Sequence, residues 1–229
     1  MAIAGDRKTI GVIGAGMIGV TTASFLLRRG HDTVLLDPGN PGEGTSFGNA
    51  GCFNGSSVVP MSMPGIIRSV PKWLADPLGP LVLRLGYLPS LAPWLIRFIR
   101  AGTPDKVRHQ ARALRTPLDR ALRRWHRWCR TLAPRTWCSG WGHLFVYRSL
   151  TSWQKERAAW NLRADNGITW DEFDVDELRQ LDPNLSREYV KGILIRENGH
   201  TTNPIGWSTV WSVHSSATGA ALSAGARWL

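Results

Sequence analysis

The sequence predicts an α/β fold, and three observations near its N-terminal end support this prediction. A β-branched run at 10–13 is typical of a buried strand. Gly14, Gly16 and Gly19 follow with the spacing G-x-G-x-x-G and open an apolar helical pattern. A second strand-like run at 33–36 then ends in Asp37. A strand, a helix and a second strand in this order predict a Rossmann-like βαβ unit with parallel strands.

The residue types in this unit suit an adenine dinucleotide. Gly14 permits a tight turn off the strand, Gly16 lets the backbone approach a pyrophosphate, and Gly19 lets the helix pack closely on the sheet. The N–H groups and the positive dipole end at the helix start favour a diphosphate. Asp37 stands where a carboxylate accepts hydrogen bonds from ribose hydroxyls and repels the 2′-phosphate of NADP. The motif alone does not choose between NAD and FAD.

The segment at 43–64 decides between these two cofactors. It is rich in Gly, Ser, Asn and Pro, whereas a nicotinamide Rossmann domain would continue here with a helix and a strand. It contains T-S-F-G-N-A-G at 45–51, directly after the second strand. This T-S-x-x-N-A-G pattern resembles the D-amino-acid oxidase superfamily of flavoproteins, most closely its D-amino-acid dehydrogenase branch. The alternative is an ordinary polar surface loop.

The resemblance extends to about Pro204 and implies FAD as the cofactor, with the loop along its pyrophosphate and flavin ring. The cofactor-binding residues then come from the glycine turn, the acid and the loop: Gly14, Ala15, Gly16, Met17, Ile18, Gly19, Asp37, Thr45, Ser46, Asn49, Ala50 and Gly51. The implied reaction passes a hydride from the Cα of a D-amino acid to the flavin, and the imino acid hydrolyses to a 2-oxo acid. D-Hydroxyproline and secondary amines are alternative substrates, and the sequence identifies no catalytic residue.

Composition and charge set limits on the class of protein. The chain has 229 residues, 43% of them hydrophobic and 20% charged, which is typical of a globular protein. Its formal net charge of +11 favours anionic partners without choosing among phosphates, lipids and nucleic acid. The six histidines show no metal-ligand spacing. The three cysteines contain no C-x-x-C pair, so no disulfide framework is predicted. Because the N-terminus also lacks a signal peptide pattern, the sequence predicts a cytoplasmic protein.

The apolar stretch at 78–99 predicts two short helical pieces. Arg84, Arg97 and three prolines interrupt it, so it is too short to span a membrane. The second piece is expected to begin near Pro93, in the first helical turn. The resembled dehydrogenases associate peripherally with the inner membrane, where a quinone accepts the electrons. This stretch is a candidate for that contact, although packing in the core or between subunits is the preferred interpretation.

The pattern at 116–132 predicts a helix that starts at Thr116, with Pro117 in its first turn. An apolar stripe that includes Leu122 and Trp125 runs along it, and arginines occupy the remaining faces. We interpret the arginines as a solvated basic face and not as a binding surface for nucleic acid or lipid, because no nucleic-acid fold signature accompanies the charge. No specific nucleic-acid partner is expected.

The region from 144 to 204 alternates strand-like and helical patterns. Strands are expected at 144–147 and 189–195, and Ser152 is expected to cap a helix that runs to 166. Asp174 and Glu177 predict a capping box for a further short helix. This order resembles the opening of an α+β substrate domain in the same superfamily.

The tail from 207 lacks a sustained apolar face, and here the pattern departs from the resembled family. The expected domains are a FAD-binding βαβ unit with its flavin loop at 1–75, part of a helical and α+β substrate domain at 76–204, and a divergent tail at 205–229. We expect the chain to be truncated, without further strands of the FAD sheet, and not to turn over D-amino acids alone. The alternative is a non-catalytic remnant with a basic, Trp-rich surface.

Overall fold

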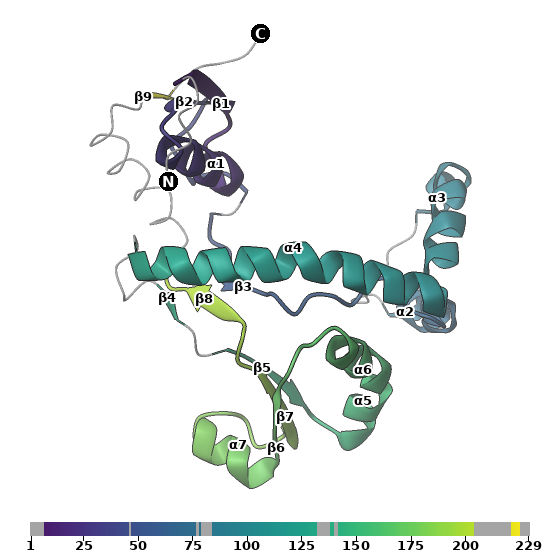
Figure 1. The fold of residues 1–229 in the computed structure, drawn as a ribbon. Coiled ribbons are helices and arrows are strands. Elements are labelled where there is room, and N and C mark those ends of the chain that lie inside the picture. Colours follow the sequence, from purple (N-terminus) through teal and green to yellow (C-terminus); the bar gives the residue numbers. More distant parts are fainter. Residues whose placement is uncertain are drawn as a thin grey trace. The chain divides into compact units, whose positions relative to one another are not determined.

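The computed structural model describes residues 7–45, 47–76, 78, 84–131, 138–139, 142–203 and 221–224 (Figure 1). The chain forms two compact units. The first comprises Met1–Phe53, Arg124–Trp141 and Gly199–Leu229, and the second comprises Asn54–Arg123 and Gly142–Asn198. The units therefore interleave along the sequence, whereas the expected domains are consecutive segments.

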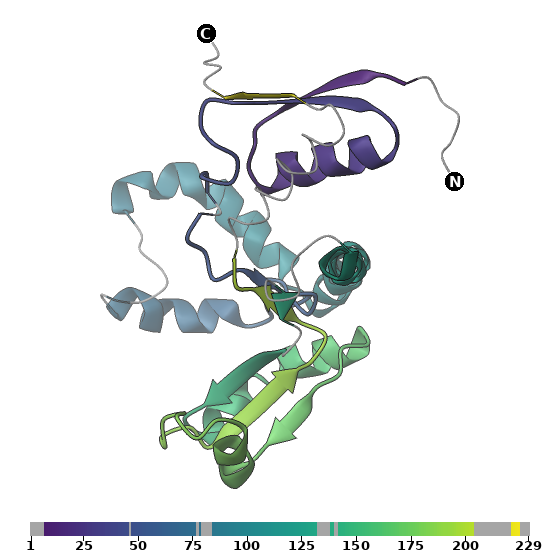
Figure 2. The ribbon, with the colours of Figure 1, turned by 90° about the vertical axis from the view of Figure 1, so that its left-hand side faces the viewer.

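The first unit is built on a parallel sheet, as the sequence predicts. Strand β1 (Thr9–Ile13) pairs with β2 (Asp32–Asp37) from Thr9 opposite Asp32 to Ile13 opposite Leu36. Helix α1 (Met17–Arg28) connects the two strands and lies along one face of the sheet (Figure 2). Its apolar face packs on that sheet, and the resulting small core consists of Ala15, Val20, Ala23 and Leu35, with Val12 beside it. The α/β class is thus confirmed.

The tail contributes a third strand to this sheet. Strand β9 (Ala221–Ala224) pairs with β2 in parallel, and the strand order is β1-β2-β9. The expectation that the tail holds no further strand of the sheet is therefore wrong. The reason is that β9 pairs through its backbone with the edge of β2, and this pairing does not require a sustained apolar pattern in the sequence. Ser46, Pro204 and the rest of the tail lie outside the described residues.

A second, antiparallel sheet of the first unit joins three distant segments. Its order is β3 (Cys52–Phe53), β8 (Gly199–Thr201) and β4 (Cys138–Ser139). Phe53 stacks on Trp125 with ring centroids 4.6 Å apart. Cys52 is free, whereas Cys129 is disulfide-bonded, a bond that the cysteine spacing does not predict.

The helices of the second unit differ from the expected boundaries. The first elements are the 3-10 helix η1 (Ile66–Ser69), helix α2 (Val70–Ala75) and the 3-10 helix η2 (Leu85–Tyr87). Helix α3 follows over Leu88–Ala101 and contains Pro93. Helix α4 runs over Pro104–Thr131, contains Pro117 and passes from the second unit into the first at Arg124. Both helices therefore begin earlier than predicted. In α4 the reason is burial, because Val107 and Ala111 in the added turns enter the core and offset the cost of an internal proline.

Sheet and helices of the second unit share one core. Strands β5 (His143–Tyr147) and β6 (Asp171–Phe173) both pair antiparallel with β7 (Lys191–Ile195). Helices α5 (Leu150–Lys155), α6 (Arg157–Asp165) and α7 (Val175–Leu181) accompany this sheet. Asp174 and Glu177 form the predicted capping box of α7. The cap of α5 is Ser149, which accepts from the N–H of Ser152, so the predicted cap at Ser152 is wrong.

Two polar contacts stabilise the second unit. The Tyr147 hydroxyl donates to Glu156 at 2.7 Å and accepts from the indole N–H of Trp160 at 2.8 Å. Burial raises the pKa of Tyr147 to about 12, and the bond to Glu156 acts in the same direction. Arg115 donates to both carboxylate oxygens of Glu197, at 2.7 and 3.0 Å. These bonds raise the pKa of Arg115 and connect helix α4 to the turn that follows β7.

Candidate dinucleotide-binding site

The glycine turn begins where β1 ends. Gly14 has φ 97°, a left-handed backbone conformation that side chains other than glycine rarely adopt. Its N–H donates to the carbonyl of Leu36 on β2 at 2.8 Å. The turn is therefore attached to the neighbouring strand from its first residue.

Gly19 allows α1 to approach this turn closely. A Cβ atom added at Gly19 would lie 1.7 Å from the carbonyl oxygen of Gly14. No side chain fits in that space, because the obstructing atoms belong to the backbone. The structure thus gives Gly19 the packing role that its place in the motif suggests.

The N-terminus of α1 presents unpaired backbone donors. Gly16 is the N-cap, no side chain caps the helix, and the helical hydrogen bonds begin with Val20 N–H to Gly16 O at 3.0 Å. The N–H groups of 16–19 therefore have no acceptor within the helix. No acidic residue lies in the first turn, and a Cβ added at Gly16 would meet nothing within 4 Å. This arrangement favours an anion with several oxygen atoms.

A pocket of about 620 Å³ lies over this helix start. Its lining combines the end of β1, the glycine turn, the first turns of α1 and two loop residues: Val12, Ile13, Gly14, Gly16, Met17, Ile18, Gly19, Thr22, Thr45 and Asn49. The structure thus brings the predicted loop residues Thr45 and Asn49 to the predicted glycine turn. Val12, Ile13 and Thr22 were not predicted. Thr22 lies three residues after Gly19, on the same face of the helix, and this spacing is the sequence signal that would have found it.

Asp37 is bonded to the backbone of the turn and does not line the pocket. Its carboxylate accepts from the N–H of Ala15 at 2.6 Å and from the N–H of Gly39 at 2.8 Å. The carbonyl of Ala15 in turn accepts from the N–H of Gly42 at 2.9 Å. Ala15 is buried, so both of its backbone polar groups are paired inside the protein.

The remaining predicted loop residues lie beyond the pocket. The side chain of Asn49 accepts from the N–H of Gly51 at 2.7 Å, and Gly51 has φ 63°. The carbonyl of Gly51 accepts from Thr201 on β8 at 2.9 Å. These bonds fix the end of the loop to the antiparallel sheet, and Ala50 and Gly51 do not belong to the pocket lining. Ser46 lies outside the described residues.

Two other kinds of site, a metal centre and a membrane-spanning helix, are absent from the part of the chain that the structure describes. Within it, no group of three or more His, Cys, Asp and Glu side chains is placed to hold a metal ion. None of its helices combines the length and the apolar character needed to cross a membrane.

Comparison with known proteins agrees with this geometry. A family profile described as "DAO: FAD dependent oxidoreductase" matches residues 9–206. The chain belongs to this family. FAD is the cofactor of the family, as its description states, and the resemblance drawn from the glycine turn and the T-S-x-x-N-A-G loop is confirmed.

Relatives in sequence carry related names. The D-amino-acid oxidase of Bradyrhizobium diazoefficiens is 36% identical over 220 residues, which are 95% of this chain and 52% of the relative. D-amino acid dehydrogenase 2 of Ralstonia nicotianae is 34% identical over 181 residues, 77% of this chain and 42% of the relative. The chain thus spans about half the length of the relatives it matches.

Solved structures support the fold. L-proline dehydrogenase from P. horikoshii has a TM-score of 0.60 at 15% identity, and the match covers 96% of this chain and 44% of the dehydrogenase chain. Glycine oxidase from Geobacillus kaustophilus has a TM-score of 0.56 at 17% identity, and the match covers 96% of this chain and 47% of the oxidase chain. At these identities the likeness establishes the fold of the FAD-dependent oxidoreductase family and no more.

Proposed function

We propose that the glycine turn and the start of α1 hold the ADP half of FAD in an oxidoreductase that acts on D-amino acids. The observation that carries this proposal is the pocket of about 620 Å³ over a helix start whose backbone donors no side chain occupies. A diphosphate would supply acceptors for the N–H groups of 16–19. Because the first turn of α1 carries no acid, nothing within it repels that charge.

The remaining predicted residues receive roles in the same proposal. Thr45 and Asn49 line the same pocket as the glycine turn and would contact the dinucleotide there. Asp37 has one hydrogen bond to each carboxylate oxygen, and each oxygen keeps a further lone pair for a ribose hydroxyl. Ser46, Asn49 and Gly51 would lie toward the flavin, as the family resemblance implies.

FAD, when bound, would supply a ring able to take a hydride from the carbon next to the substrate amine. The described residues of this chain bind and orient the cofactor, which fixes one reactant in place and removes part of the entropy cost of the reaction. The names of the sequence relatives support D-amino acids as the substrates. Oxidation of D-hydroxyproline or secondary amines is the alternative.

Cofactor binding is tested with the full 229-residue chain and FAD in equilibrium dialysis. We expect binding by the wild-type chain and none by Gly16→Val, because the branched side chain would enter the open space of the pocket. Gly11→Val is the matched control, since Gly11 lies on β1, has equally open space around it and does not line the pocket. Equal FAD binding by all three proteins would place the dinucleotide elsewhere.

The substrate class is tested in a chimera in which residues 1–203 precede the C-terminal half of the Bradyrhizobium relative. We expect dye-linked oxidation of D-alanine, and loss of that activity when Gly16→Val is introduced. D-Hydroxyproline and a secondary amine are assayed in parallel. A chimera that retains FAD but oxidises none of the D-amino acids would contradict the proposed substrate.

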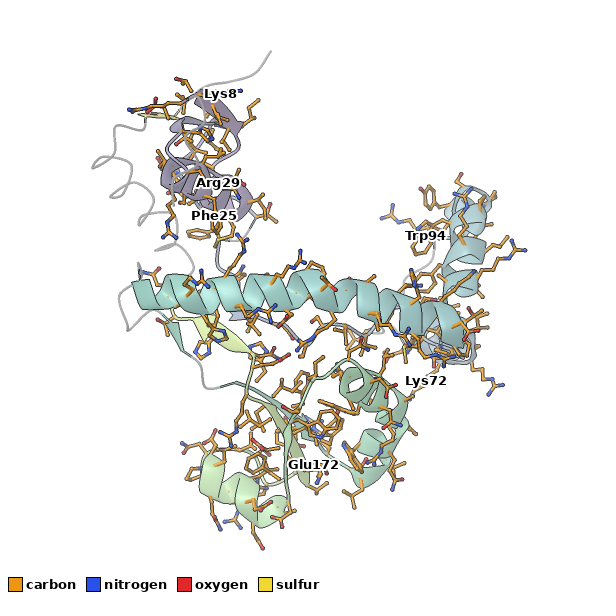
Figure 3. The ribbon with its side chains drawn as sticks, viewed as in Figure 1. Lys8, Phe25, Arg29, Lys72, Trp94 and Glu172 are labelled. Atoms are coloured by element: carbon orange, nitrogen blue, oxygen red, sulfur yellow. The ribbon has the colours of Figure 1, made fainter. Side chains whose placement is uncertain are left out.

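We further propose that η1, α2 and α3 make a peripheral contact with an anionic membrane, where a quinone would accept the electrons. None of these three helices contains a buried residue. Ile67, Trp94 and Ile96 are each at least half exposed, and Trp94 stacks on Phe98. Basic residues outnumber the single acid, Asp76, in this segment: Arg68, Lys72, Arg84, Arg97 and Arg100. Figure 3 shows Lys72 on α2 and Trp94 on α3.

Exposed apolar side chains among cations favour the interface of an anionic bilayer. The test is co-sedimentation of the chain with phosphatidylglycerol vesicles and with phosphatidylcholine vesicles. We expect binding to the anionic vesicles that decreases with salt and is weakened by Trp94→Ala with Ile96→Ser. Leu150→Ser, at a residue of α5 that is 56% exposed, is the control. Equal effects of both changes would contradict the assignment to α3.

A further inference from the structure

Asp37 has contacts that a ribose acceptor alone would not need. Its two carboxylate oxygens accept from the N–H of Ala15 at 2.6 Å and of Gly39 at 2.8 Å. Ala15 is the residue between the first two glycines of the motif, and its carbonyl is held by Gly42 at 2.9 Å. The centre of the phosphate-facing turn is therefore bonded on both sides to residues 37–42.

We propose that Asp37 is a positioning residue that holds the glycine turn in its binding conformation before the dinucleotide arrives. This inference rests on the proposed function, because it assigns the turn to a diphosphate. Gly14 and Gly16 give the turn a large conformational freedom, which must be lost when a ligand binds. A carboxylate bonded to the N–H of Ala15 removes part of that freedom in the free protein. Binding then costs less conformational entropy.

A competing role can be separated by the sign of its effect. If Asp37 only binds ribose, its removal leaves the affinity for inorganic pyrophosphate unchanged, or increases it, because a negative charge near an anion is removed. If Asp37 positions the turn, its removal weakens pyrophosphate binding, although this ligand has no ribose. The two roles therefore predict different results for the same ligand: weaker pyrophosphate binding only if Asp37 positions the turn.

The first measurement is the affinity for inorganic pyrophosphate by isothermal titration calorimetry. We expect Asp37→Ala to bind about tenfold more weakly than wild type, the usual effect of losing a hydrogen bond to a charged group. Asp32→Ala is the matched control, because it removes the same charge at the other end of β2, where Asp32 is bonded to Arg7. Unchanged or tighter binding by Asp37→Ala would overturn the proposal.

The second measurement needs no ligand. Amide hydrogen exchange at Ala15 should be at least about tenfold faster in Asp37→Ala than in wild type or Asp32→Ala, because the N–H loses its acceptor. Asp37→Asn keeps one acceptor oxygen and nearly the same volume, so it should be intermediate, and it preserves the test if the alanine variant does not fold. The proposal is overturned if Ala15 exchanges equally fast in wild type, Asp37→Asn and Asp37→Ala. If Asp37→Ala does not fold, equal exchange in wild type and Asp37→Asn overturns it.

The two measurements also separate this inference from the proposed function. If the wild-type chain binds neither FAD nor pyrophosphate, the cofactor site is refuted. Exchange at Ala15 still decides whether Asp37 holds the turn. If FAD binds and Ala15 exchanges equally in all variants, the site stands and the positioning role fails.

Discussion

Replacement of Gly19 by alanine tests the packing that creates the pocket. The added Cβ would lie 1.7 Å from the carbonyl oxygen of Gly14 and 2.8 Å from its carbonyl carbon. Ordinary carbon-to-oxygen contacts lie at about 3.3–3.6 Å, so α1 or the turn must move by at least about 1.6 Å. A flexible side chain could rotate away, but both obstructing atoms belong to the backbone.

The expected cost follows from this displacement. Overpacking usually destabilises a protein by about 1–3 kcal/mol, and we expect Gly19→Ala to lie near the upper end because the backbone must shift. In urea unfolding followed by circular dichroism, this corresponds to a midpoint lowered by about 1–2 M. FAD binding should also be lost, because the donors of the first turn move with the helix.

Gly16→Ala provides the contrast within the same motif. A Cβ at Gly16 meets nothing within 4 Å, and its φ of −71° suits any residue. Its stability should therefore be unchanged or higher by about 0.4–1 kcal/mol, while FAD binding weakens because the methyl group enters the pocket. If Gly19→Ala is as stable as wild type, α1 does not pack against Gly14 and the reasoning about the turn is refuted.

Three further predictions concern the second unit. The folded-state pKa of Tyr147 is about 12 against an ordinary 10.0, so its contribution to stability is intact below pH 10 and is lost as the pH rises toward 12. Absorbance at 295 nm should show a tyrosine titration near pH 12 that Tyr147→Phe removes. A double-mutant cycle of Arg115→Met and Glu197→Gln should give a coupling of about 1–3 kcal/mol, and a value near zero would deny the paired contact. Asp174→Ala should lower the free energy of unfolding by about 1 kcal/mol in urea, and an unchanged value would contradict the capping box.

The sequence alone determined the parts of this protein whose cause is local. The turn at Gly14 needs a backbone conformation that only glycine adopts readily, and Gly19 must lack a side chain, so the βαβ unit is readable from spacing. The capping box at Asp174 and Glu177 is equally local, since its two bonds join residues three positions apart. The T-S-x-x-N-A-G loop added the family, because its residues directly follow the second strand.

The tertiary structure decided whatever depends on distant partners. Strand β9 exists because β2 offers an open edge, and its own sequence carries no strand pattern. Pro93 and Pro117 lie inside helices, although proline disfavours the interior of a helix. In α4, the buried side chains of Val107 and Ala111 on the earlier turns offset the cost of the internal proline. Likewise, the position of Asp37 in the motif indicates a ribose contact, but its bonds to Ala15 and Gly39 became visible only once the strand and the turn were placed together. Such contacts carry no sequence signature, because either backbone amide could belong to any residue.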